Sequence, residues 1–204
     1  MRQQPRQSIQ RMKKIILASG SPRRRELMGG LDIPFTVDTG NTFEEGSIGF
    51  SDPSDVPVAM ARGKSYGFHR SLEDDELLIT ADTVVVLHTD GLSSVIGKPH
   101  SREEALGMLR TLSGRKHEVI TAVMLRDNVR EECFTDSTMV YFAELSDADI
   151  EYYVDKYRPF DKAGSYGVQE WIGYVGIERI EGSFYNVMGF PVHKVYKEIV
   201  KFAD

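Results

Sequence analysis

Residues 19–24, Ser-Gly-Ser-Pro-Arg-Arg, place two hydroxyls, a glycine and two arginines just after a short apolar run. Ser21 is suited to the N-cap of a helix, and Pro22 is suited to its first position. The unpaired N–H groups of such a helix start bind phosphate, and arginine adds a fork-shaped positive charge. Ordinary capping and surface solvation explain the same residues equally well. The candidate phosphate-binding residues in this segment are Ser19, Ser21, Arg23 and Arg24.

A carboxylate in the middle of an apolar run is the second candidate. Asp82, followed by Thr83, stands within a stretch from Leu77 to His88 that is rich in Leu, Ile and Val. A buried charge of this kind must be paired, hydrogen-bonded or metal-bound. Asp82 is either a catalytic carboxylate or a residue that holds a neighbouring loop in place. Glu45, or the adjacent Glu44, would supply a second carboxylate to a hard cation such as Mg²⁺, although adjacent acids in a loop are more often simply solvated.

Two lysines and a loop are further candidates for ligand binding. Lys64 in a predicted helix and Lys98 in a Gly-Lys-Pro turn each offer a point charge for phosphate, which alone is weak evidence. Residues 161–169, Asp-Lys-Ala-Gly-Ser-Tyr-Gly-Val-Gln, form a glycine-punctuated loop that either wraps a ligand or connects two elements. The sequence lacks the Gly-x-x-x-x-Gly-Lys-Ser/Thr signature and any Cys–His spacing typical of zinc. A P-loop enzyme and a zinc site are therefore not indicated.

Apolar periodicity and capping residues predict strands and helices that alternate along the chain. Strands are expected at residues 14–19, 35–38, 77–88, 116–126 and 133–144. Helices are expected at residues 23–28 and 57–71, after the capping serines at positions 101 and 146, and after Pro191. Residues 182–189 are expected to form a glycine-bounded loop. The interleaved order predicts an α/β fold without internal repeats.

Composition narrows the class of protein. The chain has 204 residues, 41% of them hydrophobic, and a formal net charge of −6, which argues against general nucleic-acid binding. No apolar run approaches the roughly 20 residues that span a membrane, and no signal peptide is evident. The single cysteine, Cys133, fits a reducing compartment. We expect a cytoplasmic protein with a disordered basic tail at residues 1–12 and one catalytic domain at residues 13–204.

Together these segments resemble the Maf family of nucleotide pyrophosphatases from about Lys13 to the C-terminal helix. The opening Ile-Leu-Ala-Ser-Gly-Ser-Pro-Arg-Arg is the most specific motif. It is followed in the family's order by Glu-Glu, Ala-Asp-Thr, Gly-Lys-Pro, Leu-Ser-Gly, Asp-Lys-Ala-Gly-Ser-Tyr-Gly-Val-Gln and Gly-Ser-Phe-Tyr-Asn-Val-Met-Gly-Phe-Pro. Phe190, where the family often has leucine, and the third consecutive arginine, Arg25, are small departures outside the catalytic set.

The resemblance implies a central mixed sheet, a deep cleft between two lobes, and hydrolysis of a nucleoside triphosphate between its α- and β-phosphates with Mg²⁺ or Mn²⁺. By the same resemblance Asp82 is the general base, and Glu45 and Asp82 hold the metal. Arg23, Thr83 and Gln169 match the branch that acts on dTTP and UTP, with modified pyrimidine nucleotides as further candidates. The family also suggests a homodimer. The substrate-binding residues that the resemblance implies are Ser19, Ser21, Arg23, Arg24, Lys64, Thr83, Lys98 and Gln169.

Two alternatives remain open. One is a nucleotide-binding regulator of cell division and septum formation that does not turn its ligand over, although the intact Asp82, Lys98 and Gln169 argue against pure binding. The other is a pyrophosphatase for methylated nucleotides, against which Arg23, Thr83 and Gln169 count.

Overall fold

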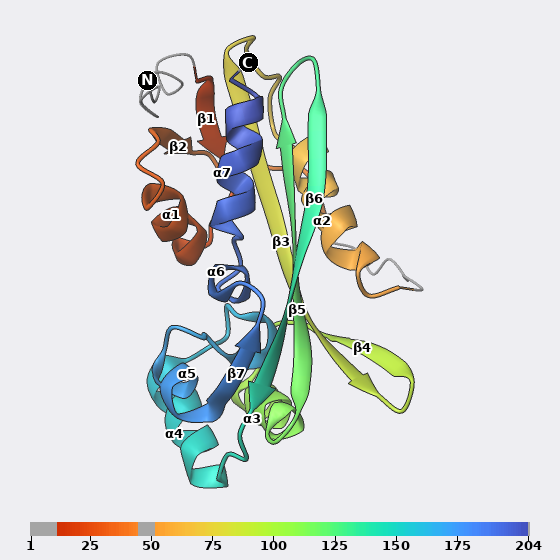
Figure 1. Ribbon diagram of the computed structural model, residues 1–204, viewed down its shortest axis with the longest axis vertical. Helices are drawn as coiled ribbons and strands as arrows, with labels where there is room; N and C mark the ends of the chain where they lie inside the picture. Colours follow the sequence, from red (N-terminus) through yellow and green to blue (C-terminus); the bar gives the residue numbers. More distant parts are fainter. Residues whose placement is uncertain (1–11, 45–51, 204) are drawn as a thin grey trace, which may run out of the picture.

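The computed structural model describes residues 12–44 and 52–203. Its strands form one sheet and its helices lie around that sheet (Figure 1). The strands are β1 (Lys14–Leu17), β2 (Phe35–Val37), β3 (Glu76–Thr89), β4 (Leu92–Ile96), β5 (Lys116–Arg126), β6 (Glu131–Phe142) and β7 (Ile177–Glu181). The helices are α1 (Pro22–Gly29), α2 (Asp55–Tyr66), α3 (Arg102–Leu112), α4 (Asp147–Tyr157), α5 (Trp171–Gly176), α6 (Phe184–Val187) and α7 (Val192–Lys201), with a short 3₁₀ turn at Ala163–Ser165.

The sheet is mixed. Its strand order is β2-β1-β3-β5-β6-β7, and β4 pairs separately with β3. β1 runs parallel to both β2 and β3, whereas β3, β4, β5, β6 and β7 pair antiparallel. The expected α/β class with a central mixed sheet is therefore confirmed. Whether a deep cleft separates two lobes stays a prediction.

Both faces of the sheet are covered, which explains why its central strands are almost continuously apolar. Successive side chains of β5 point to opposite faces. Val123 belongs to the large core, while Met124 on the other face packs with Ala61 of α2. The large core also contains Val195 and Ile199 of α7, which lies along the strands at the end of the molecule that holds both described chain ends (Figure 1). The predicted apolar face of this last helix is confirmed.

One edge of β3 is paired only in part, and this gap positions the site. β1 pairs with β3 from Glu76 to Ile79, and β4 pairs with the same edge from Val85 to Thr89. Among the described strands, none pairs with residues 80–84 on that side. Because the other edge of these residues is fixed by β5, the backbone stays extended while its open edge faces a space between β1 and β4.

The structure corrects several sequence expectations. The helix expected at residues 57–71 ends at Tyr66, because Gly67 caps it and the chain then turns back to pair with residues 40–42. A Cβ at Gly67 would lie 2.7 Å from the Asn41 side chain, so only glycine allows this close approach. The loop expected at residues 182–189 contains helix α6, and the elements β4, α5 and β7 were not predicted.

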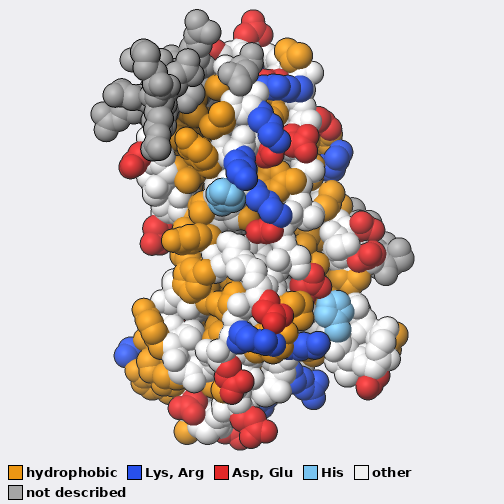
Figure 2. Space-filling model, in the orientation of Figure 1, with side chains coloured by type: hydrophobic (Ala, Val, Ile, Leu, Met, Phe, Trp, Pro, Cys, Tyr) orange, Lys and Arg blue, Asp and Glu red, His pale blue; other side chains and the backbone are white. Residues whose placement is uncertain are grey.

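The surface mixes both signs of charge. Figure 2 shows Lys, Arg, Asp and Glu side chains interspersed on the face drawn, so the charge runs of the sequence do not produce a face of one sign there. Within the described residues no helix has the length and apolar content needed to cross a membrane. Residues 1–11 of the predicted tail lie outside the described part of the chain.

Candidate active site

The centre of the candidate site is the middle of β3. Asp82 and Thr83 are half-buried, while the residues on either side of them in the strand are buried. Asp82 pairs with Ala122 of β5 and Thr83 with Thr121, so the ladder fixes both positions. Adjacent strand residues point to opposite faces, yet both side chains line one pocket, because the pocket reaches the strand at its open edge.

Helix α1 begins beside this edge as the sequence predicts. Ser21 is its N-cap, its Oγ accepts a hydrogen bond from the Arg24 backbone N–H at 3.5 Å, and Pro22 opens the helix. Ser19 is buried, and its Oγ accepts from the Ser21 N–H at 3.3 Å, which shapes the turn between β1 and α1. Ser21 lines the pocket and Ser19 is not among its lining residues. A substrate contact by Ser19 stays a prediction.

The guanidinium of Arg24 fills the open edge of β3. It donates through Nε to the Gly189 carbonyl at 2.9 Å, through Nη1 to the Ala81 carbonyl at 2.9 Å and through Nη2 to Thr83 Oγ1 at 3.0 Å. Thr83 Oγ1 is in turn 3.0 Å from Thr121 Oγ1 on β5. Arg24 therefore joins α1 to the strand and to the segment after α6. We call Asp82, Thr83 and Arg24 the pocket floor.

Lysines add positive charge next to the floor. Lys64 in the last turn of α2 lies with its Nζ 2.7 Å from Asp82 Oδ1, and both side chains are mostly buried. Lys98 is exposed in the loop after β4 and lines the same pocket. The carbonyl of its neighbour Gly97 accepts from the Gly164 N–H at 3.0 Å, which holds this loop against the 3₁₀ turn. Both predicted lysines are thus at the pocket.

The opposite wall is the loop of residues 161–170, which we call the pocket rim. Its side chains form a chain of alternating charges with Arg23 of α1. Arg23 Nη1 is 2.7 Å from Asp161 Oδ2, and Lys162 Nζ is 2.9 Å from Asp161 Oδ1. Lys162 Nζ is also 3.1 Å from Glu170 Oε1, and Glu170 accepts a hydrogen bond from the Tyr153 hydroxyl of α4. Lys162 is 8% exposed, so it is an almost buried cation between two acids.

These contacts set the charge of Asp161. Burial alone would raise the pKa of its carboxyl, but the hydrogen bonds from Lys162 and Arg23 outweigh burial and lower the pKa to about 2. Asp161 is therefore ionised at neutral pH. Its side chain remains 52% exposed at the pocket wall.

The rim rests on the sheet through an aromatic contact. Tyr166 is buried, and its hydroxyl is 2.7 Å from His117 Nε2 on β5. Burial lowers the pKa of His117 to about 4, so its ring is neutral at neutral pH. Both rings also make edge contacts with Phe142 of β6. His117 thus has a structural role.

Gln169 lies near the end of the rim and lines the pocket. Its Oε1 atom is buried and has no hydrogen-bond partner among the described residues. A buried amide oxygen without a partner is costly, so a donor from a bound ligand would stabilise it. Gln169 is one of the residues by which the chain resembles the branch that acts on dTTP and UTP.

The pocket contains about 680 Å³ of empty space, including the part open to solvent. It brings together every predicted site residue except Ser19 and Glu45, and Glu45 lies outside the described residues. Sequence reasoning did not single out Asp161, Lys162 and Tyr166, although the motif that contains them was noted. The sequence indicated only a loop that either wraps a ligand or connects two elements. The apolar part of the lining comes from Val85, Val119, Val187 and Met188.

Comparison with known proteins places the chain in a family. The family model described as Maf-like protein matches residues 14–202. The chain therefore belongs to the Maf-like protein family. It is 51% identical over 193 residues to a dTTP/UTP pyrophosphatase of Porphyromonas gingivalis, covering 94% of this chain and 95% of that protein. It is 50% identical over 189 residues to a protein of the same name from Parabacteroides distasonis, covering 93% and 96%. A third, from Bacteroides thetaiotaomicron, is 48% identical over 188 residues, covering 92% and 95%.

The Maf-like match includes every element that contributes to the pocket, from the turn before α1 to the segment between α6 and α7. The relatives align over nearly their whole lengths, so neither the floor nor the rim belongs to an added segment.

Proposed function

We propose that this chain is a nucleoside triphosphate pyrophosphatase, a nucleotide diphosphatase that hydrolyses dTTP and UTP to the monophosphate and pyrophosphate. The observation that carries the proposal is the contact between Lys64 and Asp82, 2.7 Å apart on one wall of a pocket that also contains Lys98 and the start of α1. The relatives that align over 92–94% of the chain bear the name dTTP/UTP pyrophosphatase.

The triphosphate is held by the cationic side of the pocket. The N–H groups at the start of α1 and the Ser21 hydroxyl are donors for a phosphate oxygen. Lys64 and Lys98 balance the charge that accumulates on the leaving pyrophosphate. Arg24 supports the pocket, because its guanidinium donates hydrogen bonds to Thr83 Oγ1 and to the carbonyls of Ala81 and Gly189. A direct contact of Arg24 with substrate remains part of this proposal.

Asp82 is the general base. Its carboxylate lies at the open edge of β3, where a water between it and the α-phosphorus would be oriented for in-line attack. Lys64 holds Oδ1 through its hydrogen bond, which fixes the direction of the carboxylate. The pairing of Asp82 with Ala122 of β5 limits the movement of this carboxylate during the reaction.

The donor set fits a divalent cation such as Mg²⁺ or Mn²⁺. Within the described residues no cluster of three or more His, Cys, Asp or Glu side chains is arranged around a metal position. Mg²⁺ commonly binds through one or two carboxylates together with substrate phosphates and water, so Asp82 and Glu45 are a sufficient protein contribution. When bound, the cation would supply a water of lowered pKa and neutralise phosphate charge.

Gln169 reads the base. Uracil and thymine present a carbonyl, an N3–H and a second carbonyl along one edge. The Gln169 amide can accept from N3–H through the oxygen that lacks a partner and donate to a carbonyl. Cytosine has no N3 proton and carries an amine in place of O4, so the same amide would meet mismatched groups.

The test is a panel of nucleoside triphosphates with Mg²⁺ or Mn²⁺, assayed separately for pyrophosphate and for orthophosphate. We expect pyrophosphate from dTTP and UTP, and loss of activity in excess EDTA. Orthophosphate as the first product, or full activity in EDTA, would contradict the cleaved bond or the metal respectively.

The same assay addresses the alternatives. Tight nucleotide binding without any pyrophosphate would favour a regulator of septum formation, and a preference for methylated nucleotides would favour that branch. The cytoplasmic location and the homodimer stay predictions, as does the lack of nucleic-acid and membrane partners.

A further inference from the structure

The carboxylate of Asp161 is placed in the pocket without a role in the chemistry proposed above. It bridges Arg23 and Lys162, with one oxygen 2.7 Å from the first cation and the other oxygen 2.9 Å from the second. Both cations also line the pocket, and the Asp161 side chain is half-exposed to it. The bridge holds an ionised acceptor in the wall of the pocket.

Asp161 has the capacity to accept more hydrogen bonds. Among the described residues, each of its two oxygens accepts one. A carboxylate has about four lone-pair sites, so roughly one on each oxygen remains for a ligand. The bridging cations also favour the charged form, and a hydrogen bond to a charged acceptor is stronger than one between neutral groups.

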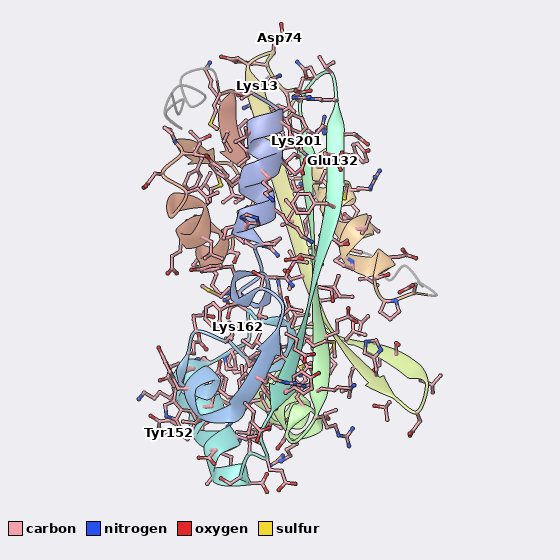
Figure 3. All side chains as sticks on the ribbon, in the orientation of Figure 1. Lys13, Asp74, Glu132, Tyr152, Lys162 and Lys201 are labelled. Atoms are coloured by element: carbon pink, nitrogen blue, oxygen red, sulfur yellow. The ribbon has the colours of Figure 1, made fainter. Side chains whose placement is uncertain are left out.

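The surroundings hold this acceptor in place. The nearly buried Lys162 also pairs with Glu170. The Tyr153 hydroxyl donates to Glu170 and accepts from the Gly167 N–H. Figure 3 shows Lys162 near the level of α6, on the side of the molecule that carries α4, α5 and β7. A network that connects the rim to α4 limits how far Asp161 can move.

The chemistry of a nucleotide decides what Asp161 meets. Phosphate oxygens are anionic acceptors and are not bound by a carboxylate. The base edge is assigned to Gln169, and Asp82, the other acid in the described lining, is paired with Lys64 beside the phosphates. The donors that remain on the nucleotide are the sugar hydroxyls. Because dTTP lacks the 2′-hydroxyl, the hydroxyl common to dTTP and UTP is the one at the 3′ position.

We propose that Asp161 accepts a hydrogen bond from the 3′-hydroxyl of the nucleotide sugar. The site then requires a free 3′-hydroxyl and tolerates both ribose and deoxyribose. This inference rests on the proposed function, since it uses the sugars of dTTP and UTP to choose the hydroxyl.

The experiment compares dTTP, UTP and 2′,3′-dideoxythymidine triphosphate by kcat/KM in the wild type, Asp161→Ala and Asp161→Asn. A hydrogen bond to a charged group corresponds to about 10- to 100-fold. We expect the wild type to prefer dTTP over the dideoxy substrate by that factor. Asp161→Ala should lower dTTP turnover and bring the ratio close to one, with Asp161→Asn between the two.

A matched control is Asp155→Ala. Asp155 on α4 has a similar exposure of 56% and accepts two hydrogen bonds from Arg102, but it is not among the residues lining the pocket. This variant should keep the wild-type ratio. A wild-type ratio near one would overturn the inference. So would an Asp161→Ala variant that loses activity equally on both substrates, because Asp161 would then act only by holding Arg23.

A binding measurement distinguishes failure of this inference from failure of the proposed function. Calorimetry with dTMP and 3′-deoxythymidine monophosphate needs no turnover. If no triphosphate releases pyrophosphate, the proposed function fails, yet a preference for dTMP that Asp161→Ala removes would still support the sugar contact. Equal binding of the two monophosphates, or no binding of either, would overturn it.

Discussion

The pocket floor and the pocket rim are positioned by different forces. On the floor, Asp82 and Thr83 are held by the backbone ladder between β3 and β5, and Arg24 adds three hydrogen bonds to that strand and the Gly189 carbonyl. On the rim, Asp161 and Lys162 are held by ion pairs between side chains. A ladder residue cannot move without breaking its neighbours' pairing, whereas a partly exposed ion pair exchanges partners at little cost. The floor is therefore suited to chemistry and the rim to recognition.

The ion pairs of the rim also differ among themselves. The Arg23–Asp161 pair is half-exposed on the acid side and is screened by solvent, so it adds little to stability. Lys162 is nearly buried between Asp161 and Glu170. Removing either acid would leave the buried ammonium of Lys162 with only one ion-pair partner. The partly exposed Arg23–Asp161 contact is therefore the more adjustable part of the rim, and the nearly buried Lys162 is its fixed part.

The largest expected effect is on the floor. Asp82→Asn removes the proposed general base and one proposed metal ligand, so kcat should fall by about 10²- to 10⁴-fold or more. The strand register and the nearby hydrogen bonds are unchanged, and an amide oxygen can still accept from Lys64. The variant should therefore keep the wild-type fold and bind nucleotide, as measured by circular dichroism and calorimetry. Near-normal turnover in a folded variant would show that Asp82 is structural.

The second effect is on the rim and should leave chemistry intact. Gln169→Ala removes the amide that we propose distinguishes uracil from cytosine. Each unpaired buried polar group costs on the order of 1–3 kcal/mol, so the wild type should prefer UTP over CTP by about 10- to 100-fold. The variant should lose most of that ratio, measured as kcat/KM. If the wild type uses CTP as well as UTP, or the variant keeps the ratio, the base is read elsewhere.

Adjacent arginines provide a direct comparison of floor and rim. Arg24→Gln leaves the carbonyls of Ala81 and Gly189 without their donor and should reduce the free energy of unfolding by about 2 kcal/mol, a fall in Tm of about 4–8 °C. Arg23→Gln disturbs only the partly exposed pair with Asp161 and should change stability by less than about 1 kcal/mol while raising KM. Thermal melts and substrate titrations of the two variants check this. Equal losses of stability would erase the distinction between floor and rim.

The sequence predicted the floor better than the rim. β3, β5 and the start of α1 are local patterns of apolar runs and capping residues, and these determined the strand with Asp82 and the N-cap Ser21. The position of Lys64 followed from the helix before β3, although its pairing with Asp82 depends on how α2 packs. The roles of Arg23 and Gln169 came from the family resemblance, not from spacing.

What could not be predicted depends on contacts distant in the sequence. Arg23 contacts Asp161 only because the fold brings α1 next to the rim. The sequence around either residue does not indicate this contact. β7 is mostly charged and does not alternate clearly, so only its pairing with β6 makes it a strand. α6 spans four residues, and the glycines on both sides favoured a loop.

The smallest expected effect concerns the histidine on which the rim rests. His117 is buried, and its ordinary pKa of about 6.5 falls to about 4 in the folded protein. Above pH 6.5 the ring is neutral in both the folded and unfolded states, and pH has no effect through it. Between pH 6.5 and 4 only the unfolded state takes up the proton. Acidification through this window therefore favours unfolding, and the loss levels off below pH 4.

The test compares the wild type with His117→Gln, which keeps a polar group able to accept from the Tyr166 hydroxyl but does not titrate. From pH 7.5 to pH 6.0 the wild type should lose about 1 kcal/mol more than the variant, by the linkage between a lowered histidine pKa and stability. Urea unfolding at both pH values measures this difference. The pH dependence that other titratable groups contribute cancels, because the two proteins share those groups. If the two proteins lose stability in parallel, His117 is already solvated or paired in the folded state. The rim would then not rest on a dry contact with Tyr166, and its attachment to the sheet would have to come from the Lys162 ion pairs instead.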